Sequence, residues 1–407
     1  HNTALGYAAL TANTEGDSNV SIGWKSLELN TTGDSNVAVG RDALGENTTA
    51  SNNIAVGFNA LNLNTTGSSN VAVGNYALDA NTTSNSNTAI GYNALTSNTT
   101  GTENTAVGSA SLEANTTANY NTALGNGSLQ DNVTGSNNTA IGRNVLRDNL
   151  GSNNTGVGMN AMERMTTGDS NTAMGQNALF ANTTGQYNVA IGRQALDSNT
   201  TASNNTALGY RALESNTTAQ RNTAVGSGAL DSVTTGENNV AVGYNAGASY
   251  TTGGQSTFIG RETGGTGGSG VTAIGYFACA NTTADNTLGI GYQALKENTS
   301  GGDNIAVGNN ALDANTTGSS NTAVGRNALG ANTTADNNTA LGLSALAANT
   351  TGSGNTAVGK GALPANTTGN NNVALGKDAM QDNTTGIQNV AIGQNALADN
   401  TTANNNV

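Results

Sequence analysis

The side chains best suited to binding chemistry recur at one place in a regular pattern. They follow the Gly of segments such as AIGY (89–92) and AVGR (38–41), and they are Tyr7, Trp24, Phe58, Tyr92, Tyr210, Tyr244, Tyr276, Tyr292, Arg41, Arg143, Arg193, Arg326 and Lys377. Aromatic and Arg side chains are enriched where proteins contact partners. The candidate residues for binding a glycan or a protein are Tyr210, Tyr244, Tyr276, Tyr292, Arg193 and Arg326. The alternative interpretation is that these side chains only cover an edge of the fold or stack on one another.

Catalytic chemistry has few candidates. The one His is His1, at the start of the chain, and no His and Cys residues have the spacing of metal ligands. Asp79, Asp197 and Asp313 each follow a Leu, but most coils have no carboxylate at this position. A glycan-cleaving site needs a pair of carboxylates, which could arise only if neighbouring chains each contributed one. We expect no catalytic residue, no bound metal and no cofactor.

The sequon N-x-[ST] occurs in most copies of a recurring N-T-T segment. Candidate glycosylation sites are Asn64, Asn98, Asn115, Asn216 and Asn366. The favoured interpretation is that Asn and Thr build a turn, because both hydrogen-bond readily to nearby backbone. Rows of Thr also raise the alternative of ice binding, although rows that lie in a turn are unlikely to be flat.

These residues belong to a repeat of seventeen residues, N-T-A-V-G-x-x-A-L-x-x-N-T-T-G-x-x, in which the first Asn is position 1. The Gly at position 5 recurs from Gly6 to Gly393 at steps of seventeen, with single steps of sixteen before Gly158 and Gly291 and one of fifteen before Gly275. A fixed period marks a repeat array rather than separate globular domains.

The repeat predicts an all-β fold. Its Gly and Asn content disfavours helix, and seventeen residues suit one coil of a parallel β-solenoid, or β-roll, with two short strands at A-V and A-L. We expect about 24 coils whose Asn residues stack in ladders. Val39, Leu44, Val324 and Leu329 are predicted core residues, as is Cys279, which replaces the Leu of its coil.

The array is predicted to have three parts. Regular coils cover 1–246, with one short coil near 149–151, and return over 292–407; irregular, Gly-rich coils cover 247–291. There Gly247 and Gly264 replace Leu, so we expect looser packing. The favoured interpretation is a structural adjustment, such as a kink or a register reset between blocks, and the alternative is a binding notch. Asn2 begins a coil and Asn406 begins another, so the chain is expected to be part of a longer protein.

Composition limits the partners. The net charge of −13 is spread thinly, and only 13 of 407 residues are Lys or Arg, which disfavours nucleic acid. No apolar run approaches the roughly 20 residues of a membrane span, so no membrane insertion is expected in this segment. One Cys excludes an internal disulfide framework.

Strand geometry also predicts self-association. Successive strand residues point to opposite faces, so one side chain of each apolar pair must point outward. A continuous outer row of Val or Leu would exceed the apolar patch that monomers normally expose. We therefore expect three chains packed around a common axis, with an outer row of Ala in a lone chain as the alternative.

The segment N-T-A-[VIL]-G-x-x-A-L resembles the head repeats of trimeric autotransporter adhesins, and NTALGYRALESNTTAQRN (205–222) resembles repeat shafts of phage tail-fibre proteins. The resemblance covers the whole chain and implies left-handed β-rolls assembled as trimers. It also implies an adhesive shaft or head of an extracellular fibre on a cell surface or virion. The alternatives are an ice- or glycan-binding solenoid and a glycan-degrading phage fibre.

Overall fold

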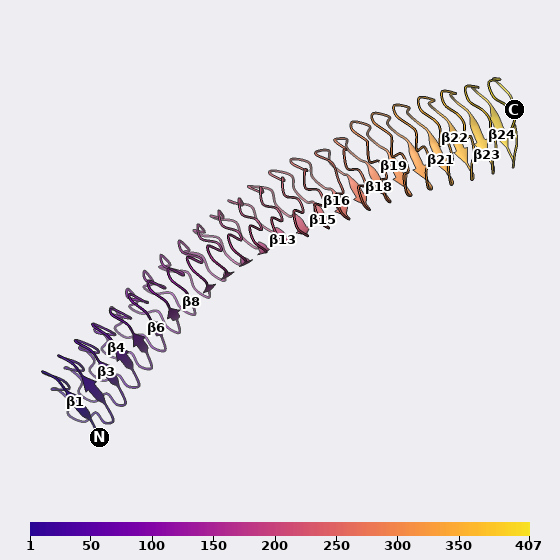
Figure 1. The fold of residues 1–407 in the computed structure, drawn as a ribbon. Helices are drawn as coiled ribbons and strands as arrows, with labels where there is room; N and C mark the ends of the chain where they lie inside the picture. The colour runs from indigo at the N-terminus through magenta and orange to yellow at the C-terminus, as the bar shows by residue number, and fades with distance from the viewer. The chain divides into compact units, whose positions relative to one another are not determined.

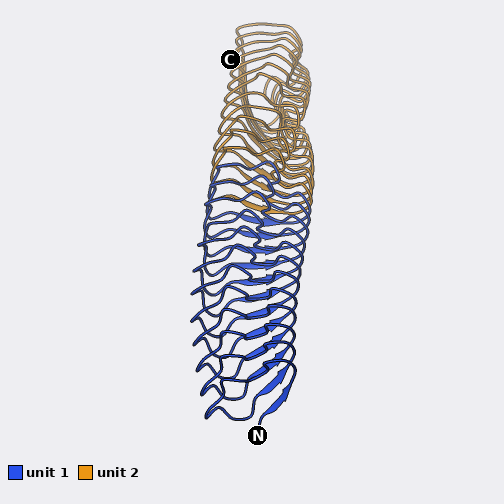
Figure 2. Cartoon of the chain, turned by 90° about the vertical axis from the view of Figure 1, so that its left-hand side faces the viewer, with its two compact units in different colours: residues 1–204 blue, residues 205–407 orange.

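The chain folds as a parallel β-solenoid. The structure is a computed structural model that describes residues 1–407 and contains 24 three-residue strands, one in each coil, and no helix (Figure 1). It divides into two compact units, residues 1–204 and residues 205–407, which are coloured separately in Figure 2. The predicted all-β solenoid with coils of about seventeen residues is confirmed.

The first unit contains strands β1 to β12, and each pairs in parallel with the next. Their bounds are Thr3–Leu5, Val20–Ile22, Val37–Val39, Ile54–Val56, Val71–Val73, Thr88–Ile90, Thr105–Val107, Thr122–Leu124, Thr139–Ile141, Thr155–Val157, Thr172–Met174 and Val189–Ile191.

The second unit contains strands β13 to β24 in the same parallel arrangement. Their bounds are Thr206–Leu208, Thr223–Val225, Val240–Val242, Thr257–Ile259, Thr272–Ile274, Leu288–Ile290, Ile305–Val307, Thr322–Val324, Thr339–Leu341, Thr356–Val358, Val373–Leu375 and Val390–Ile392.

The expected second strand at A-L does not form. Leu44 and Leu329 have φ of 51°, in the left-handed region, and so do the Leu residues at this position in the other coils. In a strand, Ala and Leu would point to opposite sides. In the observed turn both are fully buried, as Ala328 and Leu329 illustrate. Burial of two adjacent side chains offsets the cost of a left-handed L-residue, about 1–2 kcal/mol.

Two rows of buried Asn hold most coils closed. The side-chain Nδ2 of Asn321, at position 1, and of Asn332, at position 12, both donate to the carbonyl of Ala335, at 2.8 and 3.1 Å. Asn332 also donates to Oδ1 of Asn315 in the preceding coil at 2.8 Å, and the backbone NH of Asn338 donates to Oδ1 of Asn321 at 3.0 Å. The repeated Asn therefore supply the polar partners that buried backbone requires.

The irregular coils are not loosely packed, contrary to our expectation. Phe258 replaces the small Ala at position 3 and is fully buried, and Tyr250 replaces an Asn and is fully buried as well. Their ring centroids are 4.9 Å apart, and the Tyr250 hydroxyl lies 2.8 Å from Oγ of Ser256. A Cβ added to Gly247 would lie 2.7 Å from Phe258. The aromatic rings thus fill the space that the missing Leu side chains leave.

The short coil near 149–151 also keeps its turn. Nδ2 of Asn149 donates to the carbonyl of Gly151 at 2.8 Å, two residues along instead of three. One residue is lost from the exposed part of the turn while the buried hydrogen bond remains.

Candidate functional site

An apolar row runs along the outside of each unit on what we call the strand face, the side chains at positions 2 and 4. In every strand except the terminal β1 the middle residue is buried, and the outer two are exposed or half-buried, as in Val37–Val39 and Thr322–Val324. The alternation of strand residues produces this arrangement. Ile90 is 40% exposed and Leu341 is 47% exposed.

The core predictions are correct in part. Leu44, Leu329 and Cys279 are fully buried. Val39 and Val324 are half-buried on the strand face, so their assignment to the core is wrong. Ala38 and Ala323 point inward in their place, because the strand begins one residue before the Ala and not at it.

Position 4 is apolar and at least partly exposed in every coil of both units. In the first unit the row consists of Leu5, Ile22, Val39, Val56, Val73, Ile90, Val107, Leu124, Ile141, Val157, Met174 and Ile191. In the second it consists of Leu208, Val225, Val242, Ile259, Ile274, Ile290, Val307, Val324, Leu341, Val358, Leu375 and Ile392.

A Gly corner separates this row from the aromatic and cationic side chains. Gly325 has φ of 135°, and a Cβ there would lie 2.4 Å from the carbonyl oxygen of Gly342 in the next coil. Only Gly permits both the backbone conformation and the close approach. The corner lets the chain leave the strand face and project the side chain of position 6 into solvent.

Three of the predicted binding residues, Tyr244, Tyr276 and Tyr292, come together in the second unit. With Arg261, which was not among the candidates, they form a row of four side chains. The Arg261 guanidinium lies 5.6 Å from the ring centroids of both Tyr244 and Tyr276, within cation–π range. The rings of Tyr276 and Tyr292 stack at 5.6 Å. Arg261 joins the row because it occupies position 6 of the coil between two Tyr coils.

The other three candidates are not part of this row. Tyr210 is exposed two coils before Tyr244. Arg193 is exposed and belongs to the first unit. Arg326 is exposed and lines a shallow cavity of about 320 Å³ with Tyr292 and three Asn side chains.

The first unit carries a second aromatic row that our candidate list did not contain. Tyr7 stacks on Trp24 at 6.2 Å, and the Arg41 guanidinium lies 4.6 Å from the Trp24 ring and 5.6 Å from that of Phe58. The row continues through edge-to-face contacts of Tyr76 with Phe58 at 5.2 Å and with Tyr92 at 6.2 Å. Tyr76 stands at position 7 and not at position 6, but the aromatic residues at position 6 of the neighbouring coils, interrupted by Arg41, were a signal of this row in the sequence.

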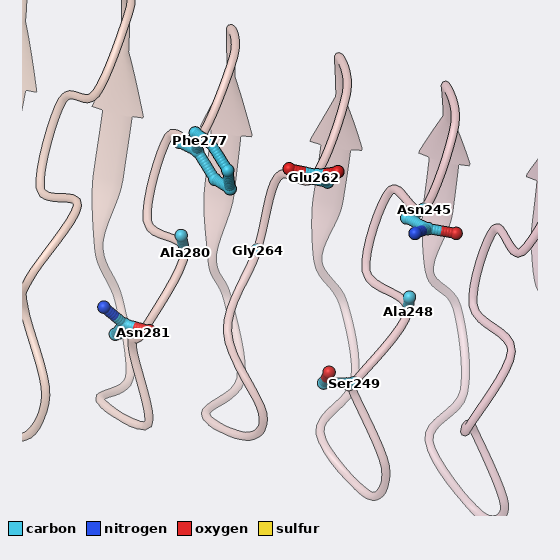
Figure 3. Close-up of a pocket in the computed structure, with 8 residues that line it drawn as sticks. All are labelled: Asn245, Ala248, Ser249, Glu262, Gly264, Phe277, Ala280 and Asn281. Atoms are coloured by element: carbon cyan, nitrogen blue, oxygen red, sulfur yellow. The ribbon is translucent and has the colours of Figure 1, made fainter.

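A notch of about 230 Å³ opens in the second unit, in the irregular coils (Figure 3). The close-up shows the chain running directly past Gly264, while the neighbouring coils bulge at Ala248 and Ala280. Asn245 and Phe277, in the coils on either side, and Glu262, in the same coil as Gly264, also line it. The Phe277 ring contacts that of Tyr276, with centroids 4.3 Å apart, so the notch borders the aromatic row.

The carboxylates that follow Leu are half-buried, each in a separate coil. Burial raises the pKa of Asp79 and of Asp313. Burial, followed by contact with the Glu214 carboxyl, raises the pKa of Asp231 to about 6. Arg211 pairs with Glu214, and its Nη2 lies 3.5 Å from Oδ2 of Asp231. This is the closest arrangement to a carboxylate pair in the chain, and Arg211 gives it the character of an ion-pair cluster.

The predicted glycosylation sites are inaccessible. Asn64, Asn98, Asn115, Asn216 and Asn366 are all fully buried. Nδ2 of Asn64, which would carry the sugar, donates to Oδ1 of Asn47 at 3.0 Å and to the carbonyl of Gly67 at 2.9 Å. These Asn residues are therefore excluded as glycosylation sites in the folded coil, and the favoured interpretation, that Asn builds the turn, is confirmed.

Cys279 is enclosed by the core. Burial raises the pKa of its thiol to about 12, so the reactive thiolate is absent at neutral pH.

No group of three or more His, Cys, Asp or Glu side chains is placed to hold a metal ion, and the structure contains no helix that could span a membrane. No protein-family model matches the chain, and no curated protein matches it.

Proposed function

We propose that the chain is the structural and adhesive part of an extracellular fibre, carried by a cell surface or a virion, and that three copies assemble through their strand faces. The observation that supports this most is the apolar row at position 4, uninterrupted through all coils of each unit. Exposed over twelve coils, it offers on the order of 800 Å² per unit, the contribution of one partner to a standard interface.

A second copy is the occupant that fits the strand face best. Identical coils present identical side chains at the same strand spacing of about 4.8 Å, so the rows of two copies can interdigitate along their length. A row this long and apolar would otherwise be exposed to water in a monomer.

The aromatic rows face away from such an assembly and are available to a ligand. The Gly corner turns position 6 out of the strand face, and Tyr92, Tyr244 and Tyr292 are about half exposed. We propose that these rows contact glycan or protein on the attached surface, with weak contacts added up over three chains. The chain has no catalytic role in this proposal.

Substitutions on the strand face test the assembly. Leu124→Lys together with Leu341→Lys places a charge in the interface and should convert a trimer to a monomer. The matched control is Thr100→Lys with Thr351→Lys, on exposed turn residues, and it should leave the trimer intact. Equal mass for the two double variants would overturn the proposal.

Ice binding is a second candidate because of an unbroken Thr row on the strand face. Thr88, Thr105, Thr122, Thr139, Thr155 and Thr172 lie in register in successive strands, beside the apolar row. This array lies on a sheet and not in the N-T-T turn. Thermal hysteresis from a monomer, lost on Thr122→Lys, would favour this candidate over the fibre.

A further inference from the structure

The notch has a definite structural cause. The coil that begins at Ser256 has fifteen residues, and its hydrogen bonds to the preceding coil locate the loss. Oγ1 of Thr251 donates to the carbonyl of Thr266, and the NH of Gly254 donates to Oγ of Ser269, so the turn is in normal register from Thr266 onward. Thr266 pairs with Thr251 and is therefore at position 13, while Gly264 is at position 9. Gly265 is the single residue between them, where a regular coil has three residues at positions 10 to 12. The coil therefore lacks the shoulder that its neighbours form at Ala248–Ser249 and Ala280–Asn281.

We propose that this notch binds one uncharged pyranose ring of a surface glycan. The proposal rests on the adhesive function above and specifies its ligand. The volume of about 230 Å³ is below the range of about 300–1,000 Å³ typical of pockets for drug-sized ligands, and it suits a single ring.

The lining matches the two kinds of surface that a pyranose has. The ring of Phe277 offers an apolar face, against which the C–H face of a sugar can stack. Asn245 and Ser249 supply an amide and a hydroxyl group, which both donate and accept hydrogen bonds, as sugar hydroxyls do. Asn281 supplies its amide oxygen as an acceptor, while its Nδ2 donates to Oε2 of Glu297 at 3.0 Å.

The charge balance favours a neutral ligand. Glu262 is the one charged residue that lines the notch, and the Arg261 guanidinium lies 3.2 Å from its Oε1. The pair leaves little net charge to attract an anion or a cation, while the carboxylate still accepts hydrogen bonds from hydroxyl groups. The Tyr244, Arg261, Tyr276 and Tyr292 row continues from the notch and can contact the next sugars of a chain.

The test uses the full chain and three probes: methyl β-glucopyranoside, methyl β-galactopyranoside and methyl N-acetyl-β-glucosaminide. Saturation-transfer NMR should show transfer to the C–H protons of at least one probe, with a Kd on the order of 1–10 mM for a single shallow contact. Failure of all three probes to bind saturably below about 50 mM would overturn the proposal.

Two variants localise the binding. Insertion of Asp-Ala between Gly264 and Gly265 restores a seventeen-residue coil with the residues that follow Leu312, and should abolish the signal without lowering the melting temperature. Asn245→Ala should weaken binding at least fivefold. Asn177→Ala is its control, because Asn177 holds the same position in a regular coil, with φ of 56° against 51° for Asn245. Unchanged binding in the insertion variant would reject the notch as the site.

The mass of the same sample separates the two proposals. If the sample is a trimer that binds no probe, the proposed sugar site in the notch is rejected and the proposed fibre assembly is still supported. If the sample is a monomer, the proposed assembly is rejected, whether or not a probe binds.

Discussion

Phe258 and Gly264 occupy complementary space. A Cβ added to Gly264 would lie 2.4 Å from Cδ1 of Phe258, closer than any real contact, so the large side chain requires the Gly. The sequence loses Leu at two successive coils and gains a Phe from the opposite wall of the core. The Phe258 ring fills the part of the core that the missing Leu side chains leave, directly behind the notch on the outer surface.

Phe258→Ala should destabilise the second unit by about 3–5 kcal/mol, because it leaves a cavity in a closely packed interior. Adding Gly247→Leu should recover part of the loss, since Leu is accepted at the same backbone conformation in other coils. Urea unfolding of the two single variants and the double variant measures the coupling. A double variant less stable than Phe258→Ala would contradict the account.

Asn332→Ala should destabilise its coils by about 1–3 kcal/mol, because the buried carbonyl of Ala335 and Oδ1 of Asn315 each lose a donor. Thr334→Ala, on the neighbouring exposed residue, should change stability by less than about 0.5 kcal/mol. Hydrogen exchange is the suitable readout, because stability in a repeat array is local. Equal protection in the two variants would show that the Asn ladder is dispensable.

Cys279 should resist alkylation in the native protein. Its thiol is fully buried with a pKa raised to about 12, so iodoacetamide at pH 8 should label it only after denaturation. Rapid labelling under native conditions would mean that the irregular coils open readily, which the packing of Phe258 argues against.

Asp231 should make the second unit less stable as pH rises from about 4 to 6. Its pKa is about 6 in the folded chain against 3.8 for the free side chain, so over this window the folded state holds a proton that the unfolded state has released. Its stabilising contribution is complete below pH 4 and is lost as pH passes 6. Thermal melts of Asp231→Asn should lack this slope. A wild-type melting temperature that rises over the window would reverse the sign and reject the assignment.

The repeat length and the small-residue pattern were sufficient to predict the solenoid and the buried Leu of each coil. They were insufficient to predict the turn at A-L, where we expected a second strand. A Leu with positive φ, such as Leu329, is rare, and secondary-structure propensities do not predict it. The assignment of Val324 to the core was inconsistent with the expected outer row of Val or Leu, because adjacent strand residues face opposite ways and Ala323 is the one that is buried.

Part of the candidate site could be predicted from the sequence. Spacing by seventeen brought Tyr244, Tyr276 and Tyr292 to one row, because position 6 always follows the Gly corner. A notch in the irregular coils was only an alternative at the sequence level, since its formation depends on where two residues are missing within a coil and on Phe258 filling the core behind it. The sequons at Asn64 and its equivalents were interpreted correctly as turn residues, because Asn hydrogen-bonds readily to nearby backbone.

The central claim is that strand faces of three copies pack together. Native mass spectrometry of the chain at about 1–10 μM, a range in which a specific interface of standard size is commonly occupied, tests it most directly. We expect a dominant species of three times the monomer mass of 40.3 kDa, which separates into monomers in the Leu124→Lys, Leu341→Lys variant. A dominant species at 40.3 kDa for the unaltered chain would contradict it.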